Sequence, residues 1–221
     1  MNKTAIILGS TGLIGSYLLD LLLAGDDYNE VISFVRKATQ HSHPKLKEYI
    51  IDFDNPDSYK ELVKGDDLFC CLGTTIKKAG SQEAFVKVDL TYPITFAQLA
   101  KENGVKQYSL ISSIGANAKS STFYLNVKGK CEEQLQSLGF LTTNIFQPSL
   151  LLGKREEFRL GEHFAQYFMS VFSFLMIGKL RKYRPIQSYY VAEAMYNTAQ
   201  IDREGVYIIT SNEILKYAKH E

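Results

Sequence analysis

A glycine-rich turn close to the N-terminus constrains the fold of this chain more than any other feature. Residues 9–15 read Gly-Ser-Thr-Gly-Leu-Ile-Gly and stand between a short apolar run, Thr4–Leu8, and an amphipathic stretch, Leu13–Ala24. A chain of this composition contains the pattern G-x-T-G-x-x-G by chance only about 0.004 times. Glycines spaced this way between a strand and a helix are typical of a turn that wraps a dinucleotide. The turn predicts the first strand-helix unit of a doubly wound α/β fold.

Each glycine of this turn has a physical role in such a site. A Cβ at Gly9 or Gly12 would obstruct the approach of a pyrophosphate to the backbone, and Gly15 lets the helix lie close to the sheet. The positive end of the helix dipole would face the phosphates, together with free N–H groups of the turn. The alternative is a tight turn without a ligand, which the flanking context disfavours. The predicted contacts also include the other residues of the turn, namely Ser10, Thr11, Leu13 and Ile14.

Apolar runs alternate with longer amphipathic stretches along the first two thirds of the chain. The runs predict short buried strands, at Thr4–Leu8, Val31–Val35, Tyr49–Asp52, Asp67–Cys71, Gln107–Ser112 and Thr142–Gln147. The amphipathic stretches predict helices that stop at glycines, at Leu13–Ala24, Ser81–Asn103 and Phe123–Leu138. The segment between the second and third strands is brief and holds Pro44, which indicates a loop. The alternation predicts a Rossmann-type parallel sheet with helices on both faces.

The rhythm changes after Gln147, although no linker separates the two parts. We therefore expect one domain over residues 1–221, with a cofactor-binding core over 1–150 and a small substrate-side cap over 151–221. The cap would hold two helices and a late strand, at Gly161–Ile177, Tyr189–Gln200 and Val206–Ile209. Phe164–Ile177 is apolar almost all round, which favours a substrate lid or an interface with a protein partner or a second copy. Contact with a membrane surface is disfavoured.

Composition excludes several classes of function. With 25 basic and 24 acidic side chains, the net charge is close to zero and does not favour binding to nucleic acid. No uninterrupted apolar run reaches about 18 residues, the length of a spanning helix, and none resembles a signal peptide, so a cytoplasmic location is expected. His41 and His43 lack partners at metal-ligand spacing, so no metal site is predicted. The three cysteines, two of them adjacent, indicate buried thiols and no disulfide framework.

The second predicted strand indicates which dinucleotide the turn would hold. NAD-specific sites place an acidic residue at the end of this strand, where it binds the ribose 2′-hydroxyl. Here the strand runs into Arg36 and Lys37 with no acidic residue. A guanidinium can pair with a 2′-phosphate through two hydrogen bonds, so NADP(H) is favoured. The alternative is a pair of solvated basic residues.

A reactive centre is indicated at the end of the fifth predicted strand. Ser112 and Ser113 end that strand, and Tyr124 and Lys128 lie one turn apart on the following helix. A Tyr-x-x-x-Lys pair arises readily by chance, so only its position gives it weight. A neighbouring ammonium stabilises phenolate and would make the Tyr124 phenol a usable acid or base, while a serine hydroxyl could hold a substrate oxygen. The alternative is an amphipathic helix with a solvated lysine.

At these residues the chain resembles the short-chain dehydrogenase/reductase superfamily, and within it the atypical branch around the NADPH-binding, oxidoreductase-like Tat-interactive protein. The likeness covers most of the chain. It rests on the glycine-rich turn, on Arg36-Lys37 and on the serine pair with the Gly115-Ala116 that follows. It is most specific in two runs, Cys-Cys-Leu-Gly-Thr-Thr over residues 70–75 and Tyr-Leu-x-Val-Lys-Gly over residues 124–129.

The resemblance implies roles for further residues. Tyr124 would donate or accept the proton, and Lys128 would also bind the nicotinamide ribose. Leu72 and Gly73 would pass beside the cofactor, and its nicotinamide end would be covered by Leu151 and Arg159. Ser112 and Ser113 precede Tyr124 by 12 and 11 residues, slightly fewer than is usual in the superfamily. The choice between the two serines therefore stays open, with a preference for Ser113.

Two functions remain in competition at this stage. The leading hypothesis is an NADPH-dependent oxidoreductase that reduces a small carbonyl compound. The second is a regulatory protein that senses NADPH and binds a partner with little turnover. Tyr124 and Lys128 favour the enzyme, and the serine spacing keeps the sensor in consideration. A sugar-nucleotide epimerase is disfavoured because the cap is too small for the usual substrate domain.

Overall fold

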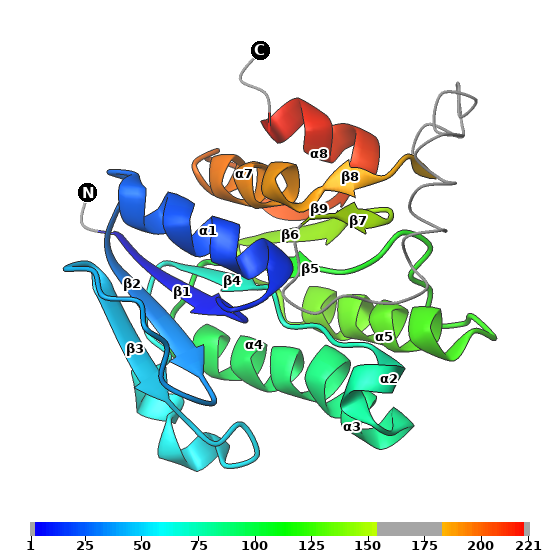
Figure 1. Ribbon diagram of the computed structural model, residues 1–221, viewed down its shortest axis with the longest axis horizontal. Helices are drawn as coiled ribbons and strands as arrows, with labels where there is room; N and C mark the ends of the chain where they lie inside the picture. The colour runs from blue at the N-terminus through cyan, green and yellow to red at the C-terminus, as the bar shows by residue number, and fades with distance from the viewer. Residues whose placement is uncertain (1–2, 154–182, 219–221) are drawn as a thin grey trace.

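A computed structural model describes residues 3–153 and 183–218 of the chain. Seven strands form one parallel sheet in the order β3-β2-β1-β4-β5-β6-β9 (Figure 1). This order, with β1 near the middle and crossovers on both sides of it, belongs to doubly wound dinucleotide-binding folds. The Rossmann-type prediction is therefore confirmed. The strands are β1 (Lys3–Leu8), β2 (Tyr28–Val35), β3 (Leu46–Ile50), β4 (Asp67–Cys70), β5 (Gln107–Ile111), β6 (Thr142–Gln147) and β9 (Gly205–Thr210).

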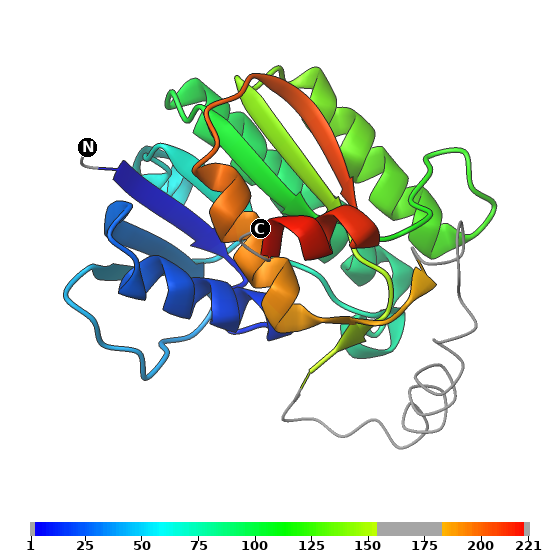
Figure 2. The same ribbon diagram turned by 90° about the horizontal axis from the view of Figure 1, so that it is seen from above.

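Helices cover both faces of the sheet, as Figures 1 and 2 show. One face carries α1 (Leu13–Ala24), α7 (Ser188–Ala199) and α8 (Ser211–Ala218). The other carries α4 (Tyr92–Glu102) and α5 (Phe123–Ser137). Shorter pieces complete the described fold: α2 (Ile76–Ala79), α3 (Gln82–Val86), the 3-10 turns η1 (Pro56–Ser58) and η2 (Lys60–Leu62), the π turn η3 (Lys87–Thr91), and the two-stranded sheet of β7 (Leu151–Leu152) with β8 (Ile186–Gln187).

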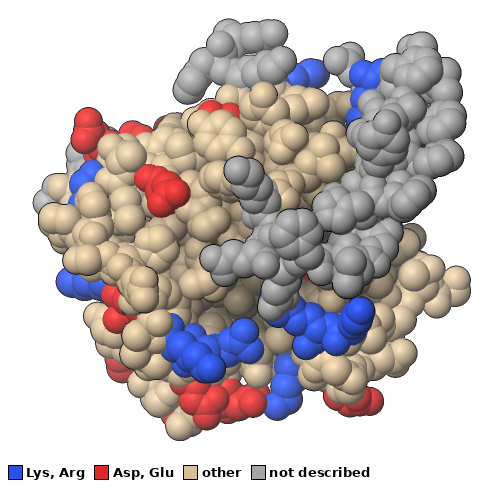
Figure 3. Space-filling model, viewed as in Figure 1, with Lys and Arg blue, Asp and Glu red and all other residues tan. Residues whose placement is uncertain are grey.

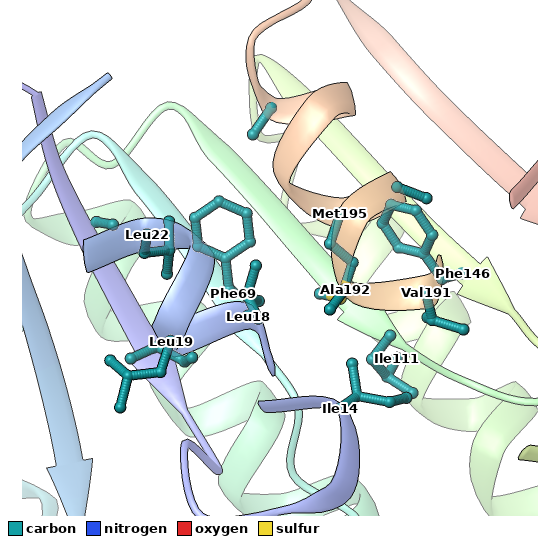
Figure 4. Close-up of a cluster of buried hydrophobic side chains, with 14 of the residues drawn as sticks. Ile14, Leu18, Leu19, Leu22, Phe69, Ile111, Phe146, Val191, Ala192 and Met195 are labelled. Carbon is teal, nitrogen blue, oxygen red and sulfur yellow. The ribbon is translucent and has the colours of Figure 1, made fainter. Parts of the chain in front are cut away.

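A separate hydrophobic core lies on each face of the sheet. On the first, Leu18 and Leu22 of α1 meet Phe69 of β4 and Met195 of α7 (Figure 4). On the second, aromatic rings dominate: the ring of Phe96 lies 5.0 Å from that of Tyr59 and 5.2 Å from that of Phe34. Burial on both faces explains why the central strands read as continuous apolar runs instead of alternating patterns. The two cores pack against the strands from both faces and so fix the positions of their carboxyl ends.

Two predicted elements differ from the structure. The third strand lies at Leu46–Ile50, a few residues before the predicted Tyr49–Asp52, because it is an edge strand with mixed exposure and lacks a buried run. The predicted helix Ser81–Asn103 is broken into α3, η3 and α4. Pro93 causes the break, because it lacks the N–H that would bond the carbonyl of Asp89 in an α-helix. The loop predicted around Pro44 is confirmed.

The described part of the segment predicted to form a cap contributes to the main layers of the fold. Strand β9 contains Val206–Ile209 and extends the large sheet beside β6, and α7 matches the predicted Tyr189–Gln200 within one residue. Helix α8 was not predicted, and it packs against α7 and the first core. The predicted helix Gly161–Ile177 lies outside the described residues, so its proposed role as a lid or interface stays a prediction.

Candidate functional site

The glycine-rich turn joins β1 to α1 and is tighter than any other residue type would allow. Gly9 has a φ of +77°, and a Cβ there would lie 2.7 Å from the carbonyl oxygen of Cys71. At Gly15 a Cβ would lie only 2.1 Å from the carbonyl oxygen of Gly9, and at Gly12 the corresponding distance is 3.2 Å. The N–H of Gly12 closes the turn by donating to the carbonyl of Gly9 at 2.9 Å. Gly15 thus permits close contact of the helix with the turn itself.

The first turn of α1 has features that suit an anionic ligand. Gly12 is its N-cap residue and offers no side-chain hydrogen bond, and no acidic residue lies in the first turn. The positive end of the helix dipole is therefore not neutralised by the helix's own side chains. Ser10 is buried and hydrogen bonds the Ser33 hydroxyl of β2 at 2.8 Å, which fixes the turn to the sheet, whereas Thr11 is exposed. Because no side chain of α1 caps or neutralises its N-terminus, the N–H groups of its first turn could bind a phosphate.

The loop after β4 connects this turn to the candidate reactive centre. Its first residues pack directly against Gly9, where the added Cβ would lie 3.0 Å from the Leu72 nitrogen. Gly73 is exposed, and a Cβ there would lie 4.0 Å from Nζ of Lys128. The glycine-rich turn, the loop and Lys128 therefore form one continuous series of neighbours. Residues that are far apart in the sequence meet here because parallel strands all end at the same edge of the sheet.

Lys128 is buried and ion-paired, which the sequence did not indicate. Its ammonium lies 2.8 Å from Oδ1 of Asp89 and donates to the Ile111 carbonyl at 3.4 Å. The lysine side chain is 6% exposed and the aspartate side chain is fully buried. Burial acts to lower the pKa of Lys128, but the electrostatic effects of Asp89 and Tyr124 and the hydrogen bond that the ammonium donates to Asp89 outweigh it and raise the pKa. The ammonium is therefore charged at every physiological pH.

Tyr124 lies one turn before Lys128 on α5 and is partly buried. Its ring packs against Phe85 of α3, with 5.7 Å between the ring centroids. Tyr124 is one of the groups that raise the pKa of Lys128. The structure thus brings the tyrosine and the lysine of the predicted pair together at the carboxyl end of β5.

The two serines that follow β5 have different environments. The hydroxyl of Ser112 is buried and donates a short hydrogen bond to the Glu132 carboxylate, which also accepts from Gln147 at 3.0 Å. Burial raises the pKa of Glu132, and these hydrogen bonds and the charge of Lys128 counteract part of that rise. Ser113 is partly exposed, and its hydroxyl makes only a long contact of 3.4 Å with the Ile114 carbonyl. The Ser113 hydroxyl is therefore less tightly held than that of Ser112.

Arg36 and Lys37 follow β2 immediately and are both exposed. Within residues 3–153 and 183–218 neither forms a salt bridge, and no acidic residue ends the strand. Figure 3 shows several Lys and Arg side chains in the lower half of the face that it draws, with Asp and Glu side chains among them.

The remaining predicted contacts are only partly described. Leu151 packs against the first core, and two residues further on Gly153 approaches the start of α1, where an added Cβ would lie 2.8 Å from Cδ1 of Leu13. Arg159 lies outside the described residues. In the described ranges no group of His, Cys, Asp or Glu could hold a metal ion, and no helix is long and apolar enough to span a membrane.

Two buried acidic residues beside the site were not predicted from the sequence. Glu132 lies four residues after Lys128 and so occupies the same side of α5, and this spacing was a usable signal. Asp89 stands four residues before Pro93, the position whose carbonyl a proline leaves without an α-helical donor. Neither signal alone shows that the carboxylate points inwards, because that depends on how α5 packs against η3 and the sheet.

Comparisons with known proteins agree with this geometry. Residues 9–162 match the protein family described as NAD(P)H-binding. The chain is 38% identical over 171 residues to Protein HTATIP2 of Rattus norvegicus, covering 76% of this chain and 70% of that protein. It is 34% identical over 169 residues to "Protein FMP52, mitochondrial" of Candida albicans, covering 74% of each. The resemblance to the Tat-interactive protein branch is therefore confirmed.

Solved structures support the fold over nearly the whole chain. One is the UDP-N-acetylglucosamine 4-epimerase from Methanobrevibacter ruminantium in complex with UDP-N-acetylmuramic acid. It gives a TM-score of 0.70 at 17% identity and covers 97% of this chain and 80% of the epimerase. The Bordetella bronchiseptica enzyme WbmH in complex with NAD+ also gives 0.70, at 16% identity, over 96% of this chain and 76% of that protein. At such low identity the likeness concerns the fold.

The expectation of a cytoplasmic location requires correction. Relatives from several fungi, at 34% to 38% identity, are named mitochondrial. The expectation rested on the lack of an apolar signal or spanning segment. Mitochondrial targeting segments are amphipathic and basic, so that observation did not bear on them.

Proposed function

Because this chain belongs to the NAD(P)H-binding family that includes HTATIP2, we propose that it is an NADPH-dependent oxidoreductase that reduces small carbonyl compounds. One observation carries the proposal: the series of neighbours from the glycine-rich turn through Gly73 to Lys128. It joins a phosphate-binding turn to an acid–base pair along the carboxyl edge of the sheet. Between the turn and Lys128 lies the loop after β4, whose backbone is in close contact with both. A dinucleotide bound along this edge would lie against that backbone.

The residues present fit the cofactor. Gly9 and Gly12 let the turn pack closely against itself and against the loop after β4, where a Cβ would meet backbone oxygens, and α1 presents an N-terminus without a side-chain cap. Arg36 and Lys37 would hold a 2′-phosphate, which is the basis for proposing NADPH over NADH. Lys128 would hold the nicotinamide ribose, with Leu72 and Gly73 beside it. Leu151 and Arg159 would cover the nicotinamide end.

NADPH, when bound, supplies the hydride that reaches the carbonyl carbon. In the proposed reaction the Tyr124 phenol donates its proton to the carbonyl oxygen, and the resulting phenolate regains a proton from water. Lys128 stabilises the phenolate through its positive charge. Ser113 donates a hydrogen bond to the same oxygen and orients the substrate, while Ser112 stays bound to Glu132. The proton and the hydride together convert the carbonyl to an alcohol.

The second candidate is an NADPH-binding sensor with little turnover. Its support is the pairing of Lys128 with Asp89, since the negative charge of Asp89 offsets part of the stabilisation that the ammonium gives to a phenolate. Consumption of NADPH by the purified protein, measured with a panel of aldehydes, ketones and quinones, separates the two. Turnover that disappears in Tyr124→Phe supports the reductase. Tight NADPH binding with no turnover on any compound supports the sensor.

A further inference from the structure

Asp89 is the most deeply buried acidic side chain beside the site, and its two carboxylate oxygens contact different groups. Oδ1 lies 2.8 Å from the ammonium of Lys128. Oδ2 accepts a hydrogen bond of 2.9 Å from the backbone N–H of Thr74. A Cβ on Gly73 would lie 3.6 Å from Oδ1, so the carboxylate also lies directly behind the loop. One side chain thus connects α5 to the loop after β4.

The local backbone around Asp89 follows from the sequence. Pro93 has no N–H to offer the Asp89 carbonyl, and the chain widens into the π turn η3, closed by the N–H of Tyr92 donating to the carbonyl of Lys87. This turn packs against both α3 and α5. A π turn inside a helix is uncommon and is frequently found at functional sites. Here it carries the carboxylate that meets Lys128.

Electrostatics make this carboxylate necessary. A lysine as deeply buried as Lys128 would lose its proton near neutral pH without a compensating charge. The titratable groups that act on it come from every neighbouring element: Asp89 of η3, Tyr124, Cys131 and Glu132 of α5, and Cys70 of β4. The thiols are neutral, because burial raises the pKa of Cys70 to about 11 and that of Cys131 to about 12. The Glu132 carboxylate accepts hydrogen bonds from Ser112 and Gln147, so Asp89 is the direct counter-ion of Lys128.

We propose that Asp89 is the positioning residue of this site, which keeps Lys128 cationic and fixes the ammonium against the Gly73–Thr74 loop. This inference deepens the proposed function, because it explains how a buried lysine can serve both the phenol and the cofactor ribose. Asp89 acts through Lys128 and Thr74 and contacts no substrate. Its carboxylate would determine the pH range over which the site binds NADPH.

The direct test measures the charge of Lys128 without any ligand. The protein is labelled with 13C-lysine, and the signal of Lys128, identified by its loss in Lys128→Met, is followed as the pH rises. In the wild type it should titrate at or above the pH of the surface lysines. In Asp89→Asn the midpoint should fall by at least about two pH units, because the buried ammonium has lost its partner. An unchanged midpoint overturns the proposal.

A second measurement distinguishes charge control from a general structural role. NADPH affinity of the wild type should be constant between about pH 6 and 9, since Lys128 stays charged there. In Asp89→Asn affinity should fall at least tenfold as the pH rises through the lowered midpoint. Loss of affinity by the same factor at every pH would contradict the proposal. Asp54→Asn is the matched control, because it removes an exposed aspartate paired with Lys87 of the same turn at 2.9 Å. Its pH profile should match the wild type.

A double variant keeps the test decisive if Asp89→Asn folds poorly. Asp89→Asn strands a buried charge, so its melting temperature should fall by at least about 5 °C. Asp89→Asn with Lys128→Met removes both charges and should recover part of that loss. A double variant no more stable than Asp89→Asn overturns the proposal. Absence of turnover or of NADPH binding in the wild type would refute the proposed function, while the lysine titration would still decide the role of Asp89.

Discussion

The hydroxyl of Ser112 donates a hydrogen bond to the carboxylate of Glu132, and this bond removes Ser112 from the surface of the site. Both side chains are buried, and Gln147 donates to both carboxylate oxygens from the other side. The bond joins the end of β5 to the middle of α5, the helix that carries Tyr124 and Lys128. It indicates different roles for the two adjacent serines.

Replacing each serine by alanine should therefore give opposite results. Ser112→Ala leaves a buried carboxylate without one donor and should lower the free energy of unfolding by about 1–3 kcal/mol. Ser113→Ala should leave stability nearly unchanged and lower kcat/KM for a carbonyl substrate at least about tenfold. Urea unfolding and NADPH-coupled kinetics measure the two effects. A rate loss confined to Ser112→Ala would reverse the assignment of the serines.

Glu132 should make stability depend on pH. Burial raises its pKa in the folded protein, so the fold favours the protonated carboxyl. Its contribution is fully present below the unfolded pKa of about 4.3 and is lost as the pH rises through the folded value. Glu132→Gln should remove this pH-dependent part of the unfolding free energy. The difference in unfolding free energy between variant and wild type should therefore change between the unfolded and the folded pKa of Glu132. A pH-independent difference would show that Glu132 does not titrate differently in the folded state.

Tyr124→Phe tests the acid–base assignment. The change removes one oxygen and keeps the ring that packs against Phe85. Turnover of any carbonyl substrate should fall about 10² or more, with NADPH affinity nearly intact. Steady-state kinetics and fluorescence titration with NADPH measure both quantities.

Lys128→Met supplies the contrast for that experiment. It removes the ammonium assigned to both phenol and ribose, so rate and NADPH affinity should fall together. General destabilisation would weaken both functions in both variants, and circular dichroism melting curves control for it. Full activity in Tyr124→Phe would refute the catalytic assignment and leave the fold unaffected.

Arg36 should determine cofactor choice. The proposed pairing with a 2′-phosphate predicts that NADPH binds at least tenfold more tightly than NADH, a difference of about 1.4 kcal/mol. Arg36→Asp should narrow or reverse this gap, because an aspartate repels the phosphate and can accept from a 2′-hydroxyl. Titration with both cofactors at the same ionic strength measures the ratio, and Arg203→Lys, far along the chain in a contact with Tyr207, serves as a charge-conserving control. Equal affinities in the wild type would exclude the preference.

Two glycines of the turn should respond differently to substitution. At Gly12 an added Cβ meets its nearest neighbour at 3.2 Å, which a small shift can relieve, so Gly12→Val should fold but lose NADPH binding. At Gly15 the added Cβ would lie 2.1 Å from a backbone oxygen, so even Gly15→Ala should unfold at markedly lower temperature. Thermal melting and NADPH titration separate the effects. A folded Gly12→Val protein with unchanged affinity would show that the phosphates lie elsewhere.

The sequence alone was sufficient for features that depend on neighbours along the chain. The turn at residues 9–15 requires glycine for local reasons, since backbone conformation and close approach exclude a Cβ. Burial on both faces of a sheet gives continuous apolar runs, so strands such as Thr142–Gln147 were predicted at their observed bounds. These two signals, combined with alternation of strands and helices, determined the fold class.

Only the tertiary structure decided which polar side chains meet. Asp89 and Lys128 are 39 positions apart in the sequence, and their ion pair exists because η3 packs against α5. The hydrogen bond that holds the Ser112 hydroxyl likewise depends on Glu132, which lies on a different element. The hydrophobic pattern of the sequence indicates whether a residue is buried. It does not indicate which side chain will contact that residue in the folded protein. That partner depends on how helices from distant parts of the chain pack together, and it determines the charge of a buried group.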